Sequence, residues 1–141
     1  MSNSAQTSAS TRIAALLDEN SFVEVGAYIT ARSTDFNMTE QETPADGVVT
    51  GYGTIGGGPL CVCKYAAISM AMKMGAPVIG LIDCAGLRLQ EATDALNGFG
   101  QMYLSQTMAS GVIPQISAIF GTCGGGMAVS AGPTEFTLIK A

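Results

Sequence analysis

The apolar positions of this chain fall into short, dense runs separated by longer stretches of mixed character. Runs of about four to eight apolar residues are typical of strands buried on both faces, and apolar residues at helical spacing indicate helices. From residue 65 onward the pattern predicts helix 65–74, strand 78–83, helix 90–110, strand 115–120, helix 125–131 and strand 136–139. This alternation with short connections predicts parallel strands joined by crossover helices, and the expected fold class is therefore α/β.

The preceding part of the chain is patterned differently. Residues 48–54 and 59–63 are typical of two strands joined by a glycine-rich turn at 55–58, which predicts an antiparallel hairpin. The glycines at 51–56 match G-x-G-x-x-G, but a strand follows them instead of a helix, so a hairpin is favoured over a dinucleotide-binding turn. Residues 31–45 are polar and are expected to form a loop.

The N-terminal segment is expected to contribute little to the core. Residues 1–10 are rich in Ser, Thr and Ala and are predicted to be disordered, which leaves 11–141 as one domain. Thr11 is expected to cap a short helix that carries Ile13, Leu16 and Leu17 on one face.

Composition and charge narrow the function classes. The 141 residues are 48% hydrophobic, a surplus that predicts buried parallel strands, a large subunit interface, or both. A net charge of −5 with six Lys and Arg argues against nucleic acid as a partner. No apolar stretch approaches the roughly 20 residues of a membrane-spanning helix, and residues 1–8 lack the features of a secretory signal. The expected location is the cytoplasm.

Two glycine-rich turns are the strongest candidates for chemistry. Ala85-Gly86-Leu87 and Gly124-Gly125-Gly126 each follow a predicted strand and lead toward a predicted helix. Free backbone N–H groups at such turns can bind an oxygen that gains negative charge, so two adjacent turns would form an oxyanion hole from main chain.

The missing residue types also limit the chemistry. The chain has no histidine, which excludes a Ser-His-Asp or Cys-His nucleophile within it. Its four cysteines lack C-x-x-C spacing, so no metal site is expected. Packing is the favoured role for Cys84 and Cys123, which lie in or beside the two turns; reactive thiols are the alternative.

Three segments resemble the carboxyltransferase subunits of biotin-dependent acyl-CoA carboxylases and decarboxylases. Residues 77–91 are similar to the family string P-V-I-G-L-x-D-S-G-G-A-R-x-Q-E, and residues 109–126 to A-S-G-V-I-P-Q-I-S-x-I-x-G-x-C-A-G-G. The likeness extends back through residues 46–55. The resemblance implies a crotonase-like superhelix of β-β-α units, which is the family's fold.

The resemblance also implies a reaction. The family moves a carboxyl group between biotin, carried on a partner protein, and the α-carbon of a short acyl-CoA. A site of backbone amides without a nucleophile suits this chemistry, because the protein stabilises an enolate and holds two substrates together. The implied partners are a biotin carboxyl carrier protein and a further carboxyltransferase half, in a homo- or hetero-oligomer. A membrane decarboxylase complex is one assembly that the resemblance allows.

Carried over by position, the thioester oxygen would be held by the amides of Gly86 or Leu87 and of Gly124 or Gly125. Their neighbours Ala85, Arg88 and Gly126 would contact the substrate. For Arg88, an ion pair with Asp83 or Glu91 is favoured over a substrate contact.

The chain departs from the family pattern at several points. Leu87 stands where the family usually has alanine, and its larger side chain would narrow the acyl pocket. A glycine-rich loop expected after Cys63 is missing, and the chain stops at Ala141 where the family continues. It is thus expected to be the first part of such a subunit, shortened internally, and to assemble with other chains.

Two other functions remain open on the sequence alone. The first is another crotonase-fold enzyme, an isomerase or hydratase, which would need Glu91 or Asp94 as a carboxylate near the hole. The second is a non-catalytic assembly subunit that keeps the fold without the chemistry.

Overall fold

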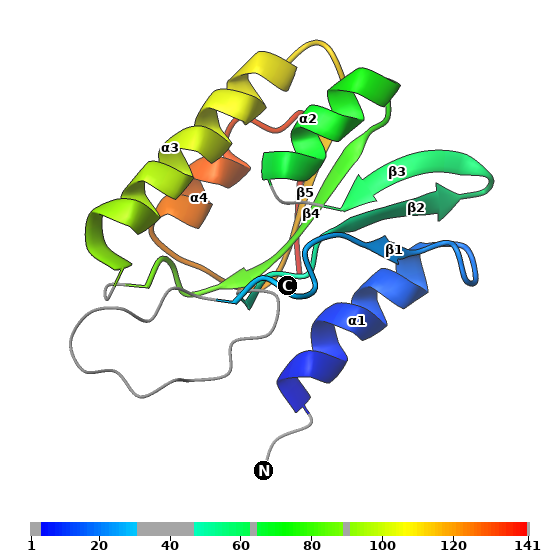
Figure 1. The fold of residues 1–141 in the computed structure, drawn as a ribbon, viewed down its shortest axis with the longest axis horizontal. Helices are drawn as coiled ribbons and strands as arrows, with labels where there is room; N and C mark the ends of the chain where they lie inside the picture. Colours follow the sequence, from blue (N-terminus) through cyan, green and yellow to red (C-terminus); the bar gives the residue numbers. More distant parts are fainter. Residues whose placement is uncertain (1–3, 31–46, 63–64, 89–90, 141) are drawn as a thin grey trace.

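One six-stranded sheet organises the molecule (Figure 1). A computed structural model describes residues 4–30, 47–62, 65–88 and 91–140. The strands follow one another across the sheet in chain order: β1 (Val23–Glu24), β2 (Gly51–Ile55), β3 (Gly58–Val62), β4 (Val78–Cys84), β5 (Gln115–Cys123) and β6 (Phe136–Ile139). The helices are α1 (Ser4–Leu16), α2 (Tyr65–Met74), α3 (Ala92–Ala109) and α4 (Gly126–Ala131).

The predicted hairpin is formed by β2 and β3, which pair antiparallel from Gly51↔Val62 to Ile55↔Gly58. Gly56 and Gly57 connect them with φ values of 56° and 80°, the left-handed conformation that a tight hairpin turn needs at both positions. The two-residue strand β1 pairs antiparallel with β2 and was not predicted, because so short an edge strand leaves no alternating pattern in the sequence.

The predicted parallel half is confirmed. β3, β4, β5 and β6 pair parallel, with α2, α3 and α4 as the connections. Gly75 ends α2 with a φ of 66°, and the amide of Ala76 donates to the Ala71 carbonyl at 3.0 Å, which is the hydrogen bond of a Schellman-type helix end.

The sheet separates two apolar clusters on its opposite faces. On one face, Cys61 and Val78 pack with residues of α2 and with Ala109 at the end of α3. On the other face, Leu60 and Val62 pack against α1. Neighbouring residues of β3 therefore serve different clusters, as the period of two in a strand requires. Figure 1 accordingly shows α2, α3 and α4 on one side of the sheet and α1 on the other.

The first helix is longer than expected. It begins at Ser4, so most of the segment predicted to be disordered belongs to it, and Thr11 lies inside the helix instead of capping it. Ile13 and Leu17 do reach the core, with 4% and 8% of their surfaces exposed, as the apolar pattern predicted. The predicted loop at 31–45 lies outside the described residues.

Within the described part of the chain, no helix combines the length and apolar character needed to cross a membrane.

Candidate functional site

The two glycine-rich turns lie side by side at the ends of β4 and β5. Cys84 and Cys123 are partners across the two parallel strands, and the Gly124 amide donates to the Cys84 carbonyl at 3.0 Å. A Cβ at Gly124 would collide with the Ala85 carbonyl oxygen. The approach of the two turns therefore depends on the missing side chain at position 124. The juxtaposition expected from the sequence is present.

Two further glycines have backbone conformations that other residues rarely adopt. Gly86 has a φ of 129° and Gly125 a φ of 55°. Gly125 is the N-cap residue of α4, so the helix begins at Gly126, one position later than predicted. The glycines at 86 and 125 thus set the direction of the chain as it leaves each strand.

The hydrogen bonds decide which amides remain available. The Gly124 amide is engaged by the Cys84 carbonyl, so the expectation that it could bind substrate does not fit this structure. The Gly86 amide lies 3.4 Å from the Cys84 sulfur. The amides of Leu87 and Gly125 have no hydrogen-bond acceptor among the described residues. The amides of Ala85 and Gly126 likewise have no acceptor there, so each turn keeps open amides, and those of Leu87 and Gly125 are at positions expected to hold the thioester oxygen.

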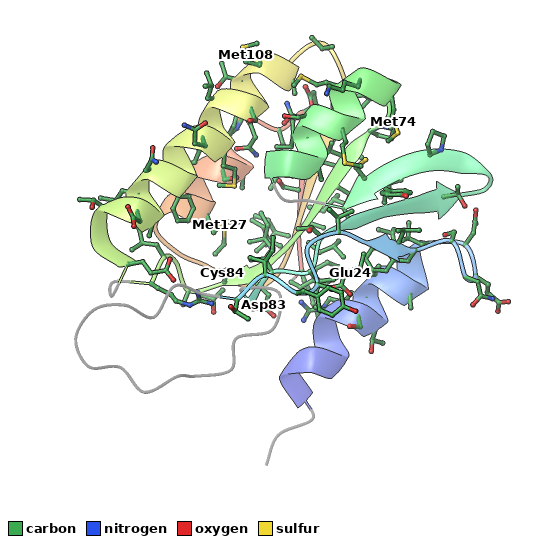
Figure 2. All side chains as sticks on the ribbon, viewed as in Figure 1. Glu24, Met74, Asp83, Cys84, Met108 and Met127 are labelled. Atoms are coloured by element: carbon green, nitrogen blue, oxygen red, sulfur yellow. The ribbon has the colours of Figure 1, made fainter. Side chains whose placement is uncertain are left out.

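Asp83 connects the ends of the two strands. Its carboxylate accepts a hydrogen bond from the Thr122 amide at 3.2 Å, and a Cβ at Gly121 would collide with it. Arg12 of α1 pairs with the same carboxylate at 3.1 Å, and its guanidinium lies 4.8 Å from the centre of the Phe120 ring. Asp83 and Cys84 lie together at the end of β4 (Figure 2), and the pair with Arg12 connects Asp83 to α1, which lies on the face of the sheet opposite α3 (Figure 1).

Sequence reasoning considered Asp83 only as a partner for Arg88. The role of Arg12 was missed, because 71 residues separate it from Asp83 and no local pattern links them. Arg88 instead pairs with Glu91 at 3.2 Å, the other partner that the sequence allowed.

Residues of α3 contact the second turn. The Tyr103 hydroxyl donates to the Gly126 carbonyl at 2.7 Å, and a Cβ at Gly126 would come within 2.8 Å of the Phe99 ring. The two aromatic rings pack with their centres 5.9 Å apart. Gly126 is therefore needed for close packing against α3. The sequence alone does not reveal this role, because Gly126 is one of three consecutive glycines.

A buried polar network fixes α4 relative to α3 and β5. The Gln106 amide group donates to the Ser130 carbonyl at 3.0 Å, and the Ser130 hydroxyl donates back to Gln106 Oε1 at 3.0 Å. Gln115, 2% exposed, donates to the Gln106 carbonyl at 3.0 Å. Every buried side-chain nitrogen and oxygen in the described part of the chain has a partner. The helix that follows the second turn is thus rigidly placed.

No group of three or more His, Cys, Asp or Glu side chains among the described residues is arranged to hold a metal ion. Cys61, Cys84 and Cys123 are free thiols. Burial raises the pKa of the Cys61 thiol, since the thiolate would lose its hydration.

The sequence matches the family described as "Carboxyl transferase domain" over residues 3–68 and 64–141. It is 43% identical over 143 aligned positions to methylmalonyl-CoA decarboxylase subunit alpha of Veillonella parvula, covering 89% of this chain and 28% of that protein. It is 41% identical over 146 positions to a biotin-dependent acetyl-/propionyl-coenzyme A carboxylase beta5 subunit of Mycobacterium tuberculosis, covering 91% of this chain and 27% of the relative. The chain thus spans little more than a quarter of these relatives' lengths.

A solved structure is similar over nearly the whole chain. The transcarboxylase 12S structure, a hexamer assembly with hydrolysed methylmalonyl-coenzyme A bound, superimposes with a TM-score of 0.89 at 37% identity. The superposition covers 93% of this chain and 30% of that one. The expected crotonase-like α/β fold is thereby confirmed.

The alignments also bear on the internal shortening that the sequence indicates after Cys63. Each alignment runs over more positions than the 141 residues of the whole chain, so both relatives carry residues within the matched region that this chain lacks. The family match itself consists of two segments, which overlap at residues 64–68. The two matched segments together account for nearly all of the sequence, and the chain belongs to the carboxyl transferase domain family.

Proposed function

We propose that this chain supplies the acyl-CoA-binding part of a biotin-dependent carboxyltransferase. The proposed reaction moves a carboxyl group between biotin and the α-carbon of a short acyl-CoA such as propionyl- or methylmalonyl-CoA. The observation that carries the proposal is the pair of adjacent turns, whose open backbone amides include those of Leu87 and Gly125. The names of the relatives support the substrate class.

The proposed role of the two open amides is electrostatic. Removing or adding a carboxyl group next to a thioester places negative charge on the thioester oxygen. Preorganised N–H donors stabilise that charge, and losing one such donor typically costs about 3 kcal/mol of transition-state stabilisation. Amides held by the glycines at 86 and 125 need no rearrangement when the charge develops. Ala85, Arg88 and Gly126 lie next to these groups and are the proposed substrate contacts.

Biotin, carried on a partner protein, would supply or accept the carboxyl group and a proton. We assign no biotin contact to this chain, because the amides of Leu87 and Gly125 are assigned to a single carbonyl oxygen. A second carboxyltransferase half and a biotin carrier are accordingly the proposed partners. The proposal is supported by the relatives, which are named as subunits or described as a hexamer.

The half-buried Leu87 side chain is proposed to limit the length of the acyl group. It follows the first turn directly, so its side chain and its open amide lie at the same point of the proposed site. A branched residue there should favour short acyl chains over long ones, and Leu87→Ala should relax that preference.

The isomerase or hydratase alternative is less well supported. It would require a carboxylate beside the hole, and Glu91 is held by Arg88 in an ion pair. Asp94, the other candidate, is an exposed residue in the first turn of α3.

The test is carboxyl exchange between labelled methylmalonyl-CoA and a biotinylated carrier, with the partner half present. We expect exchange that requires biotin, no turnover by the chain alone, and no hydration or isomerisation of enoyl-CoA. Turnover without biotin would overturn the proposal. Binding of acyl-CoA without exchange in the full assembly would instead support a non-catalytic assembly subunit.

A further inference from the structure

Cys84 and Cys123 stand opposite one another at the carboxyl ends of β4 and β5. They are paired across the two parallel strands, beyond an irregularity in the register that follows Ile82, and the Gly124 amide donates to the Cys84 carbonyl at 3.0 Å. Neighbouring strands lie about 4.8 Å apart. A disulfide needs a Cα separation of about 4.4–6.8 Å, so the backbone spacing suits one.

The two thiols are free, and both cysteines are half-buried residues. In this reduced state the Cys84 sulfur lies 3.4 Å from both the amide nitrogen and the carbonyl oxygen of Gly86. By contrast, Cys61 is fully buried, with no exposed surface, and contacts the α2 side of the core. We therefore expect reagents in solution to react more readily with Cys84 and Cys123 than with Cys61.

We propose that Cys84 and Cys123 are a modification site, a thiol pair that a low-molecular-weight disulfide such as oxidised glutathione converts to an intramolecular disulfide. One thiolate attacks the glutathione disulfide and releases one glutathione, which leaves a mixed disulfide. The neighbouring thiolate then attacks the protein sulfur of that mixed disulfide and releases the second glutathione. The two cysteines are oxidised by two electrons, and oxidised glutathione is reduced to two thiols that take up the two protons.

Formation of the bond changes the first turn. The Cys84 sulfur is the only hydrogen-bond partner of the Gly86 amide within the described residues, so a bond from that sulfur to Cys123 changes the surroundings of this amide. Because Gly86 precedes Leu87, oxidation would also alter the proposed acyl-CoA site. This consequence rests on the proposed function, whereas the disulfide itself does not.

The test treats the reduced chain with oxidised glutathione and maps peptides under non-reducing conditions. Cys63, outside the described residues, is replaced by serine in every sample. We expect a peptide joining Cys84 to Cys123, with a loss of two hydrogens in the intact mass, reversed by dithiothreitol. The link should vanish in C84S and in C123S and persist in the matched control C61S. A cooperative unfolding transition of each reduced variant will show that the variant is folded.

A second readout follows the Gly86 amide by nuclear magnetic resonance. Its signal should move on oxidation and return on reduction in the chain that keeps both cysteines, but not in folded C123S. The proposal is wrong if the two sites give only stable mixed disulfides with glutathione. It is equally wrong if Cys61 crosslinks as readily as Cys84, or if no link forms while both thiols react with an alkylating reagent.

Discussion

Gly124 occupies a position where the two turns leave no room for a side chain. An alanine at position 124 would bring its Cβ into collision with the Ala85 carbonyl oxygen, which is part of the backbone and cannot rotate away. Relief would require the ends of β4 and β5 to separate. The distance between the open amides of Leu87 and Gly125 therefore depends on this single glycine.

Replacing Gly124 by alanine should lower the free energy of unfolding by about 1–3 kcal/mol, the usual cost of overpacking. It should also weaken acyl-CoA binding. The matched control is Gly98→Ala in α3, where a Cβ meets nothing within 4 Å. That substitution should raise the free energy of unfolding by about 0.5–1 kcal/mol, because alanine favours the helix. Urea denaturation measures both. Equal stability of the two variants would contradict the close approach of the turns.

Among the elements, the β2–β3 hairpin is tied to the segment after α1 through one carboxylate. Asp18 accepts hydrogen bonds from the amides of Gly56 and Gly57, both at 3.0 Å, and from the Thr54 hydroxyl at 2.8 Å. The bond from Gly57, followed by those from Thr54 and Gly56, lowers the pKa of Asp18. The turn thus prefers the ionised form of the carboxyl.

The lowered pKa of Asp18 predicts how the stability of the folded chain changes with pH. A lowered folded-state pKa means that the stabilisation is complete above the unfolded value, about 3.9, and disappears as pH falls through the folded value. Asp18→Asn should therefore be less stable than the native chain at pH 7, and the difference should shrink below about pH 4. Glu19→Gln, at a neighbouring residue without a hydrogen-bond partner among the described residues, is the control. A difference that stays constant between pH 7 and pH 3 would exclude this role for Asp18.

The buried network between α3, β5 and α4 gives a second prediction at this scale. Ser130→Ala removes the donor to Gln106 Oε1 in a buried site. An unpaired buried acceptor costs about 1–3 kcal/mol, so thermal unfolding should shift clearly downward. Ser105→Ala, whose hydroxyl bonds only to the carbonyl one turn back in α3, should change stability by less than about 0.5 kcal/mol. Similar losses in both variants would show that the network does not fix α4.

The elements illustrate how far sequence reasoning reaches. Strands β4 and β5 and helices α2 and α3 were predictable because their patterns are long or continuously apolar. β1 has two residues and no periodicity, and it exists only because β2 provides an edge to pair with. Likewise, the turns at Gly86 and Gly125 were predictable from their glycines. The Arg12–Asp83–Thr122 contacts were not, because they depend on where the sheet brings α1.

At the scale of the whole molecule, the β6 end of the sheet is exposed. Phe136, Leu138 and Ile139 have 64%, 63% and 72% of their surfaces exposed, and β6 pairs with β5 alone among the described strands. An edge strand with apolar side chains on both faces favours association.

We therefore expect light scattering at micromolar concentration to give a mass above that of the 14.4 kDa chain. Leu138→Glu should shift the mass toward the monomer, since it places a charge on the exposed strand. Leu104→Glu on α3, a comparably exposed position, should not. A monodisperse monomer of the native chain would contradict the expectation, and a shift caused only by Leu104→Glu would place the association on α3 instead.

The central claim is that the open amides of Leu87 and Gly125 bind the thioester oxygen of an acyl-CoA. The most direct measurement is the amide spectrum of the 15N-labelled chain during titration with propionyl-CoA, compared with titration by free coenzyme A. We predict that the Leu87 and Gly125 amide signals move with propionyl-CoA and much less with coenzyme A, because only the former carries the carbonyl. Identical shifts with both ligands, or saturation by propionyl-CoA that leaves these two amides unmoved, would contradict the account.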